Sequence, residues 1–173
     1  VMNRTIIKLF FYLCILTALP SYAQNAVHYY FKTMDIRNGL SQNTVYQILQ
    51  DRKGFMWFGT KDGLNRYDGL SYRVYKKENS GLGKNFITAL YEDHEGNIWI
   101  GTDGGVFIYN PVLDSFTAFN QTSDKGTVIK DFVTMIGSDE YDNIWISVEN
   151  QGLFCYNHEK RLRNYLHDSG MSN

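Results

Sequence analysis

Three tryptophans stand in nearly the same surroundings along this chain of 173 residues, and this repetition constrains the fold more than any other feature. They are Trp57, Trp99 and Trp145, separated by 42 and 46 residues. An aspartate stands six residues before each tryptophan and a tyrosine ten or eleven residues after it. A period of roughly 20–50 residues is typical of proteins in which one small unit buries its faces by stacking on its neighbours. The sequence therefore predicts a stack of three similar units.

Within each unit the apolar residues alternate with a period of two, which is typical of β-strands. The chain has 11 Phe, 13 Tyr and 15 Gly but only 2 Pro, a composition that favours strands and tight turns. In the first unit we expect strands over residues 45–50, 55–60, 64–67 and 71–76. Four short antiparallel strands in such a repeat form one blade of a propeller. The predicted fold class is all-β: a partial β-propeller of about three four-stranded antiparallel blades plus a leading outer strand.

The repeat also predicts where the segments of the chain begin and end. We expect a signal peptide over 1–23 and propeller repeats over 24–173, made of an outer strand (28–38), blade 1 (about 39–80), blade 2 (about 81–122), blade 3 (about 127–168) and the start of the next linker (169–173). Propellers usually close with about four to eight blades, so three blades indicate the N-terminal part of a longer protein. The alternative is a complete small protein that closes its ring by self-association.

The start of the chain has the pattern of a secretory signal peptide. Arg4 and Lys8 give a basic beginning, residues 9–19 form an apolar run, and Pro20 is followed by small residues suited to cleavage. The run is shorter than the about 20 residues that span a bilayer, although an uncleaved anchor is the alternative. We therefore expect an exported protein in which Cys155 is the only remaining cysteine and no disulfide forms within the chain.

The polar residues supply no recognisable catalytic or metal site. A net charge of −1 without a basic stripe argues against nucleic acid as a partner. The four histidines lack the spacing of metal ligands, and the acidic residues at 93–95 and 139–142 fall at turns. The glycine-rich residues 101–105 are not followed by the helix of a phosphate loop, and no serine-nucleophile motif occurs. We assign no catalytic residue, no metal ligand and no cofactor.

The first unit contains a specific motif. It reads Gly-Leu-Ser-Gln-Asn-x-Val over residues 39–45 and Gln-Asp-x-x-Gly-Phe-x-Trp-Phe-Gly-Thr-x-x-Gly-Leu-Asn-Arg-Tyr-Asp-Gly over 50–69. This sequence resembles the two-component regulator propeller repeat, and the second unit keeps Trp-Ile-Gly-Thr at 99–102. The third unit departs from the pattern, because Ser147-Val148 replaces Gly-Thr and Thr127-Val128 replaces Gly-Leu. A less regular third blade is therefore expected.

The resemblance implies a function that the residues alone do not. Repeats of this family form the periplasmic sensor of hybrid histidine kinases from Bacteroides-type bacteria, which sense glycan fragments and switch on polysaccharide-utilisation genes. The chain would then be a non-catalytic N-terminal fragment of a periplasmic sensor. Its parent would be anchored in the inner membrane through a transmembrane segment absent from this chain. The implied partners are an oligosaccharide ligand, the remainder of the parent kinase and, through the parent, a second copy in a homodimer.

Two alternative functions stay open. One is a secreted propeller that binds partners or serves as a scaffold, and the other is a fragment of a propeller lyase or hydrolase. Aromatic side chains are the candidates for sugar contact, because a flat ring suits the apolar face of a pyranose. Such rings can equally fill the space between blades, so the ligand-binding residues are unknown from the sequence. The candidates are Tyr29, Tyr30, Tyr72 and Tyr75 on expected outer strands, and Tyr141 on a hairpin turn.

Overall fold

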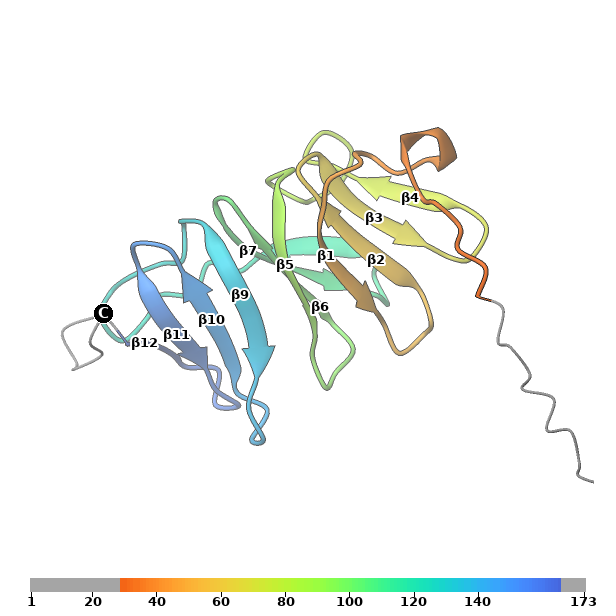
Figure 1. Cartoon of the computed structure of the whole chain (residues 1–173). Helices are drawn as coiled ribbons and strands as arrows, with labels where there is room; N and C mark the ends of the chain where they lie inside the picture. The colour runs from red at the N-terminus through yellow and green to blue at the C-terminus, as the bar shows by residue number, and fades with distance from the viewer. Residues whose placement is uncertain (1–28, 166–173) are drawn as a thin grey trace, which may run out of the picture. The chain divides into compact units, whose positions relative to one another are not determined.

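A computed structural model describes residues 29–165 of the chain (Figure 1). The predicted signal peptide over 1–23 and the linker predicted over 169–173 lie outside the described residues. The chain divides into two units, residues 1–33 and 34–173, and all the described strands belong to the second unit.

The second unit contains one short 3₁₀ helix, η1 (Ile36–Asn38), and three antiparallel sheets of four strands each (Figure 1). Sheet 1 consists of β1 (Val45–Gln50), β2 (Met56–Thr60), β3 (Gly63–Tyr67) and β4 (Tyr72–Tyr75). Sheet 2 consists of β5 (Ile87–Glu92), β6 (Ile98–Thr102), β7 (Gly105–Asn110) and β8 (Ser115–Ala118). Sheet 3 consists of β9 (Val133–Ser138), β10 (Ile144–Val148), β11 (Gly152–Tyr156) and β12 (Leu162–Tyr165). Strands pair in chain order in every sheet, which confirms the predicted all-β fold of three four-stranded units.

The leading outer strand predicted over 28–38 is not formed by the described residues of that segment. Residues 29–35 contain no strand, and η1 follows them. Asp35 caps η1, since its carboxylate accepts a hydrogen bond from the Arg37 amide at 2.9 Å. All three described sheets take their four strands from later in the chain, so none of them includes this segment. Similarity to an outer strand was therefore not sufficient to form one.

Each repeated tryptophan is held by the aspartate six residues before it. The indole Nε1 donates to one carboxylate oxygen, at 2.8 Å for Trp57–Asp51, 2.8 Å for Trp99–Asp93 and 2.9 Å for Trp145–Asp139. The other carboxylate oxygen accepts two backbone amides of the turn between the first two strands, as Asp51 does from Lys53 and Phe55 at 3.0 and 2.9 Å. One side chain thus fixes both the turn and the ring, which explains the constant spacing.

The tryptophans of sheets 1 and 2 pack between neighbouring sheets. Trp57 is 1% exposed and contacts Tyr75 of its own sheet and Tyr109 of sheet 2, with ring centroids 6.0 and 5.0 Å away. A second set of three rings is built in the same way from Trp99, Phe119 and Tyr156. Aromatic contacts of this kind add to the hydrophobic stabilisation of an interface. The first two repeated tryptophans are therefore core residues.

The first strands of the three sheets, β1, β5 and β9, lie side by side (Figure 1). Their close approach requires the glycine of the Trp-x-Gly-Thr motif. A Cβ on Gly59 would lie 2.7 Å from Ile87 Cγ2, and a Cβ on Gly101 would lie 2.7 Å from Val133 Cγ1. Real Cβ atoms essentially never come so close to another heavy atom. In sheet 3 this place is taken by Ser147.

The linker before sheet 3 differs from the alignment that the sequence suggested. Leu40 and Leu82 stand five residues before their first strands and are 4% and 1% exposed. Val128, which the sequence aligns with them, is only partly buried, and Ile129 is 3% exposed in its place. The linker therefore reaches the core with one residue fewer, while sheet 3 keeps the strand order of the other two.

We expect Gly101→Ala to destabilise the chain by about 1–3 kcal/mol, because the added methyl group forces Val133 and β9 away from sheet 2. Gly137→Ala is the matched control: Gly137 also lies in a strand, and a Cβ there meets nothing within 4 Å. Its effect should stay within about 0.5 kcal/mol. Urea unfolding of the three proteins measures the difference, and equal losses for both variants would contradict the steric argument.

Asp139 gives the fold an acid-sensitive element. Hydrogen bonds from the Asn143 amide and the Trp145 indole outweigh desolvation and lower the pKa of Asp139 from 3.8 to about 2. A lowered pKa in the folded state contributes stability above the unfolded pKa, and that stability is lost as the pH falls from about 4 towards 2. Thermal unfolding between pH 7 and pH 2 should show a shallower acid limb for Asp139→Asn than for the unmodified chain. Parallel curves for the two proteins would contradict this assignment.

Candidate functional site

A crevice of about 290 Å³ lies between sheets 2 and 3. It is bounded by the turn between β5 and β6, the turn between β9 and β10, and the turn between β11 and β12. Its apolar surface is formed by Trp99, Ile108, Ile144 and Tyr156. Its polar surface is formed by Asp93, His94, Glu95, Asn97, Asp142, Asn157, His158 and Lys160. An aromatic surface with a polar rim is typical of small-molecule sites.

Two differences between the repeats create this crevice. Between sheets 1 and 2, the Arg66 guanidinium lies 4.8 Å from the centroid of the Phe55 ring and donates to the Tyr109 hydroxyl at 2.9 Å. In sheet 2 the corresponding positions hold Ile108 and Asn97, since Ile108 pairs with Trp99 as Arg66 pairs with Trp57. Both replacements are smaller than the residues they replace. The space that Arg66 and Phe55 fill in the first interface is therefore open in the second.

The polar groups around the crevice differ in exposure and in whether they already have hydrogen-bond partners. Asp93 is 7% exposed and accepts hydrogen bonds from the Trp99 indole and from the Glu95 and Asn97 amides, so it serves the fold. At the rim, His94 Nδ1 lies 3.9 Å from Asp142 Oδ1, and both side chains are more than half exposed. Burial raises the pKa of Tyr156, whose hydroxyl is a hydrogen-bond donor at neutral pH as in any tyrosine. The rim thus offers both donors and acceptors to a neutral polar molecule.

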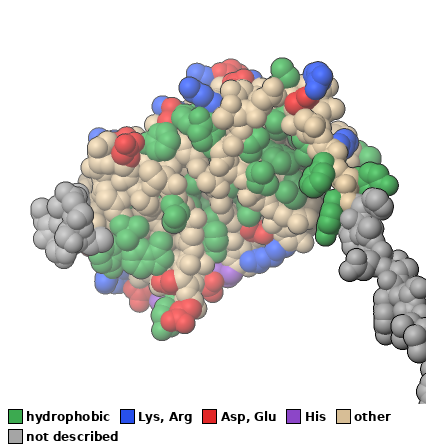
Figure 2. Space-filling model, in the orientation of Figure 1, with side chains coloured by type: hydrophobic (Ala, Val, Ile, Leu, Met, Phe, Trp, Pro, Cys, Tyr) green, Lys and Arg blue, Asp and Glu red, His purple; other side chains and the backbone are tan. Residues whose placement is uncertain are grey.

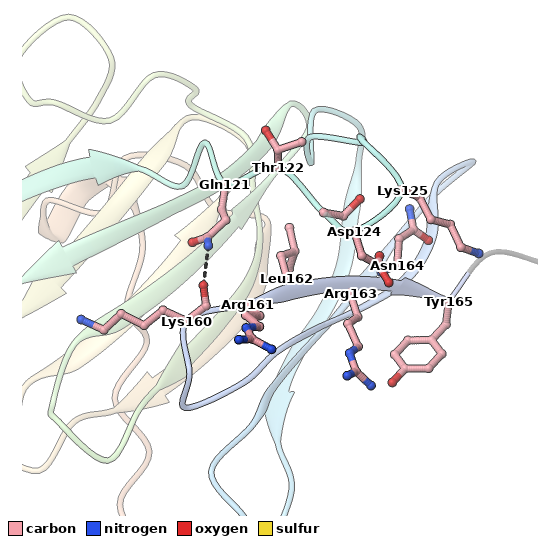
Figure 3. A pocket seen from close by; sticks show the side chains of 11 residues that line it. Gln121, Thr122, Asp124, Lys125, Lys160, Arg161, Leu162, Arg163, Asn164 and Tyr165 are labelled. Carbon is pink, nitrogen blue, oxygen red and sulfur yellow. Dashed lines mark hydrogen bonds between the residues drawn. The ribbon is translucent and has the colours of Figure 1, made fainter.

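A second, larger cavity of about 680 Å³ follows the edge of β12 (Figure 3). The linker before sheet 3 lies along this edge. The backbone N–H of Asp124 donates to the Leu162 carbonyl at 2.9 Å, and the Asp124 carboxylate accepts from the backbone N–H of Asn164 at 2.9 Å. Arg161, Arg163 and Tyr165 project to one side of β12, and the Asn164 side chain points to the other side (Figure 3).

The Asn164 side chain is unusual for its position. It is 3% exposed, and neither its Oδ1 nor its Nδ2 has a hydrogen-bond partner among the described residues. The corresponding places in sheets 1 and 2 hold the apolar residues Val74 and Ala118, as the strand pairing shows. Burying an amide without partners costs free energy. Because its polar atoms are inaccessible, Asn164 does not present them to a ligand in the cavity.

The structure separates the tyrosines that the sequence offered as ligand contacts. Tyr75 is 4% exposed in the interface between sheets 1 and 2, and Tyr72 is partly buried in β4. Tyr29, Tyr30 and Tyr141 are 76%, 94% and 71% exposed. None of the five lines the crevice, and no cluster brings them together. The crevice was not predicted from the sequence. Its signal is the difference between residues at matched repeat positions, Phe55 against Asn97 and Arg66 against Ile108.

His94 and His158 both line the crevice. Their spacing in the sequence did not indicate a metal site. Across residues 29–165, no group of three or more His, Cys, Asp or Glu side chains is arranged to hold a metal ion. That part of the chain also contains no helix with the length and apolar character needed to cross a membrane. Figure 2 shows acidic and basic side chains interspersed on the visible face, in keeping with the net charge of −1.

Comparisons with known proteins agree with this fold. The family model of the two component regulator propeller matches residues 39–62 and 81–104. The extracellular domain of the putative hybrid two component system BT3049 from B. thetaiotaomicron has a TM-score of 0.71 and 28% identity, over 80% of this chain and 20% of that one. The corresponding domain of BT4673 from the same organism has a TM-score of 0.66 and 28% identity, over 75% and 20%.

Among curated proteins, Histidine kinase P4 of Formosa agariphila is 42% identical over 59 residues, which are 34% of this chain and 4% of that protein. The chain thus spans about a fifth of the solved domains and a small part of the curated relative. These findings confirm the resemblance seen in the sequence. Two segments of the chain match the two component regulator propeller model, and the chain is similar to the extracellular domains of hybrid two-component systems.

Proposed function

We propose that this chain is part of the periplasmic ligand-sensing propeller of a hybrid two-component sensor kinase. In this proposal the parent detects glycan fragments and controls polysaccharide-utilisation genes, and the chain itself performs no catalysis. The similarity to extracellular domains of hybrid two-component systems supports the sensor role. The signal-peptide pattern at the start of the sequence supports export. The parent would join this propeller to the kinase across the inner membrane and pair with a second copy.

The crevice between sheets 2 and 3 is the observation that supports a glycan ligand. Trp99 and Tyr156 contribute to its apolar surface, which suits the apolar face of a sugar ring. Side chains such as Asn157 and His158 lie where they could bind hydroxyl groups. A volume of about 290 Å³ suits one or two sugar residues better than a long chain. We therefore place the recognition of one end of an oligosaccharide in this crevice.

The other two functions have less support. A lyase or hydrolase needs an acid and a base, or a nucleophile, directed at one substrate atom. The most buried carboxylate of the crevice, Asp93, is instead engaged by an indole and two backbone amides. A pure scaffold would not require the crevice. It is the function we would adopt if no ligand binds.

Isothermal titration of the chain against a panel of neutral and acidic oligosaccharides tests the proposal. Asn97→Phe places at this position the ring that Phe55 supplies in sheet 1, so it should fill the crevice and weaken binding at least tenfold. Asn143→Phe is the matched control, because Asn143 holds the same turn position in sheet 3 and donates to Asp139 as Asn97 does to Asp93. It should leave binding unchanged. Equal affinity for both variants would reject the crevice, and no binding across the panel would favour the scaffold.

Asn164→Val should raise the stability of the chain by about 1 kcal/mol, because it removes an unpartnered buried amide and installs the side chain found at Val74. It should leave oligosaccharide binding unchanged, since Asn164 does not line the crevice. Urea unfolding and the same titration measure the two effects. A loss of stability would mean that the amide has a partner in solution, and a loss of binding would move the site to the β12 edge.

A further inference from the structure

One face of sheet 3 carries a cavity of about 370 Å³ whose lining comes only from the strands and turns of this sheet. The lining residues are Tyr141, Asn143, Trp145, Cys155, Asn157, His158, Arg163 and Tyr165. We call this the open face. Figure 2 shows hydrophobic side chains gathered over the region of sheet 3. Trp145 is less buried here than Trp57 and Trp99 are at their interfaces.

The open face repeats a surface that is covered twice within this chain. In sheet 1, Trp57 and Tyr75 receive the ring of Tyr109 from sheet 2. In sheet 2, the corresponding rings receive Tyr156 from sheet 3. On the open face, Trp145 and Tyr165 stand in the same arrangement with centroids 5.6 Å apart. In the two covered interfaces the third ring is a tyrosine from the next sheet. No described residue supplies this ring on the open face.

Charge distinguishes the two covered faces from one another. In the first interface, Arg73 NH1 lies 2.6 Å from Asp114 Oδ2, and the Tyr109 hydroxyl donates to Asp114 Oδ1 at 2.7 Å. Desolvation would raise the pKa of Asp114, but these contacts outweigh it and hold the pKa below its usual value. In the second interface the corresponding residues are Thr117 and Lys160, which cannot form an ion pair. The interface with an arginine at the position of Arg73 thus has an acidic residue at the position of Asp114, and the interface without the arginine has no acidic residue there.

The open face has the charge pattern of the first interface. Arg163 pairs with Cys155 in the strand register as Arg73 pairs with Arg66, so the two arginines hold the same position. None of the other residues that line the cavity beside Arg163 is acidic. The face therefore presents an arginine in the position where Arg73 meets Asp114.

The first strand that meets the open face must differ from β5 and β9. Gly59 and Gly101 leave room for the branched side chains of Ile87 and Val133, with 2.7 Å to a hypothetical Cβ. Sheet 3 has Ser147 at this place, two residues after Trp145 and so on the same side of β10, and its hydroxyl lies 2.9 Å from the Thr134 hydroxyl. A branched residue placed as Ile87 is would collide with the Ser147 side chain.

We propose that the open face binds a further four-stranded sheet of the same repeat with three definite features. Its third strand ends in a tyrosine that completes the ring set of Trp145 and Tyr165. Its following turn carries an aspartate or glutamate that pairs with Arg163. Its first strand begins with glycine, alanine or serine, opposite Ser147. This inference rests on the proposed function, in which the chain belongs to a longer propeller. The aligned part of this chain covers only 20% of each of the two solved neighbours, which leaves room for such a sheet.

The reading frame that follows the codon of Asn173 gives the first test. The next repeat should contain the tyrosine, the acidic turn residue and the small residue at the three stated positions. A frame that ends, or a repeat with a neutral or basic turn residue, overturns the proposal.

Charge reversal gives the second test, using both this chain and the polypeptide that continues into the next repeat. In this chain, Arg73→Glu should change the unfolding equilibrium constant by roughly two- to tenfold, while Arg163→Glu should leave it unchanged. In the longer polypeptide both variants should change the unfolding equilibrium constant by this amount. Replacing the acidic turn residue of the next repeat by lysine should restore the stability lost in Arg163→Glu. Arg161→Glu is the control, because Arg161 directly precedes β12 and projects to the same side as Arg163 (Figure 3) but does not line the cavity of the open face. Any effect of Arg161→Glu, which also breaks its contact with Glu159, should be the same in both polypeptides.

Two outcomes would overturn the proposal. One is an Arg163→Glu variant that is neutral in the longer polypeptide. The other is self-association of the short chain that Arg163→Glu abolishes in sedimentation, because the occupant would then be a second copy. Failure of the sensing proposal is separate: it appears as absent oligosaccharide binding in a polypeptide whose Arg163 coupling is intact.

Discussion

The hydrogen bond between an aspartate carboxylate and an indole N–H is the contact on which each sheet depends. It joins a tight turn to the largest apolar side chain of the unit, so the local backbone and the interface between sheets are fixed by one residue. A buried carboxylate is stable only when its oxygens are satisfied, and here backbone amides and the indole supply that satisfaction. Each repeat therefore places one hydrogen-bonded carboxylate inside an apolar interface. The spacing of six residues between the aspartate and the tryptophan follows from the length of the turn.

Particular residues show which parts of the fold could be predicted from the sequence. The strands around Trp57 were predictable to within about one residue at each end, because alternation and turn residues agree there. The prediction over 28–38 failed for the described residues because a local likeness to an outer strand does not supply the sheet that the strand would join, and the three described sheets have four strands each without it. Ile129 was missed because burial is decided in three dimensions, and a linker can reach the same site with one residue fewer.

The candidate site was less visible than the fold for a related reason. Ile108 and Asn97 look like ordinary strand and turn residues, and only their small size relative to Arg66 and Phe55 opens a crevice. The three repeats share the residues that hold the sheets together, so the candidate site lies where equivalent interfaces differ. The tyrosines that drew attention in the sequence are distributed over the core and the exposed turns because their positions follow the strand register.

The consecutive order of strands within every sheet has a consequence for how the protein forms. Each sheet draws only on about thirty neighbouring residues and touches only the sheets before and after it in the chain. Contacts of short sequence separation close quickly, and assembly can proceed one sheet at a time from the end that emerges first. Under the proposed export, the first sheet can thus begin to fold on the far side of the membrane before the later sheets have crossed.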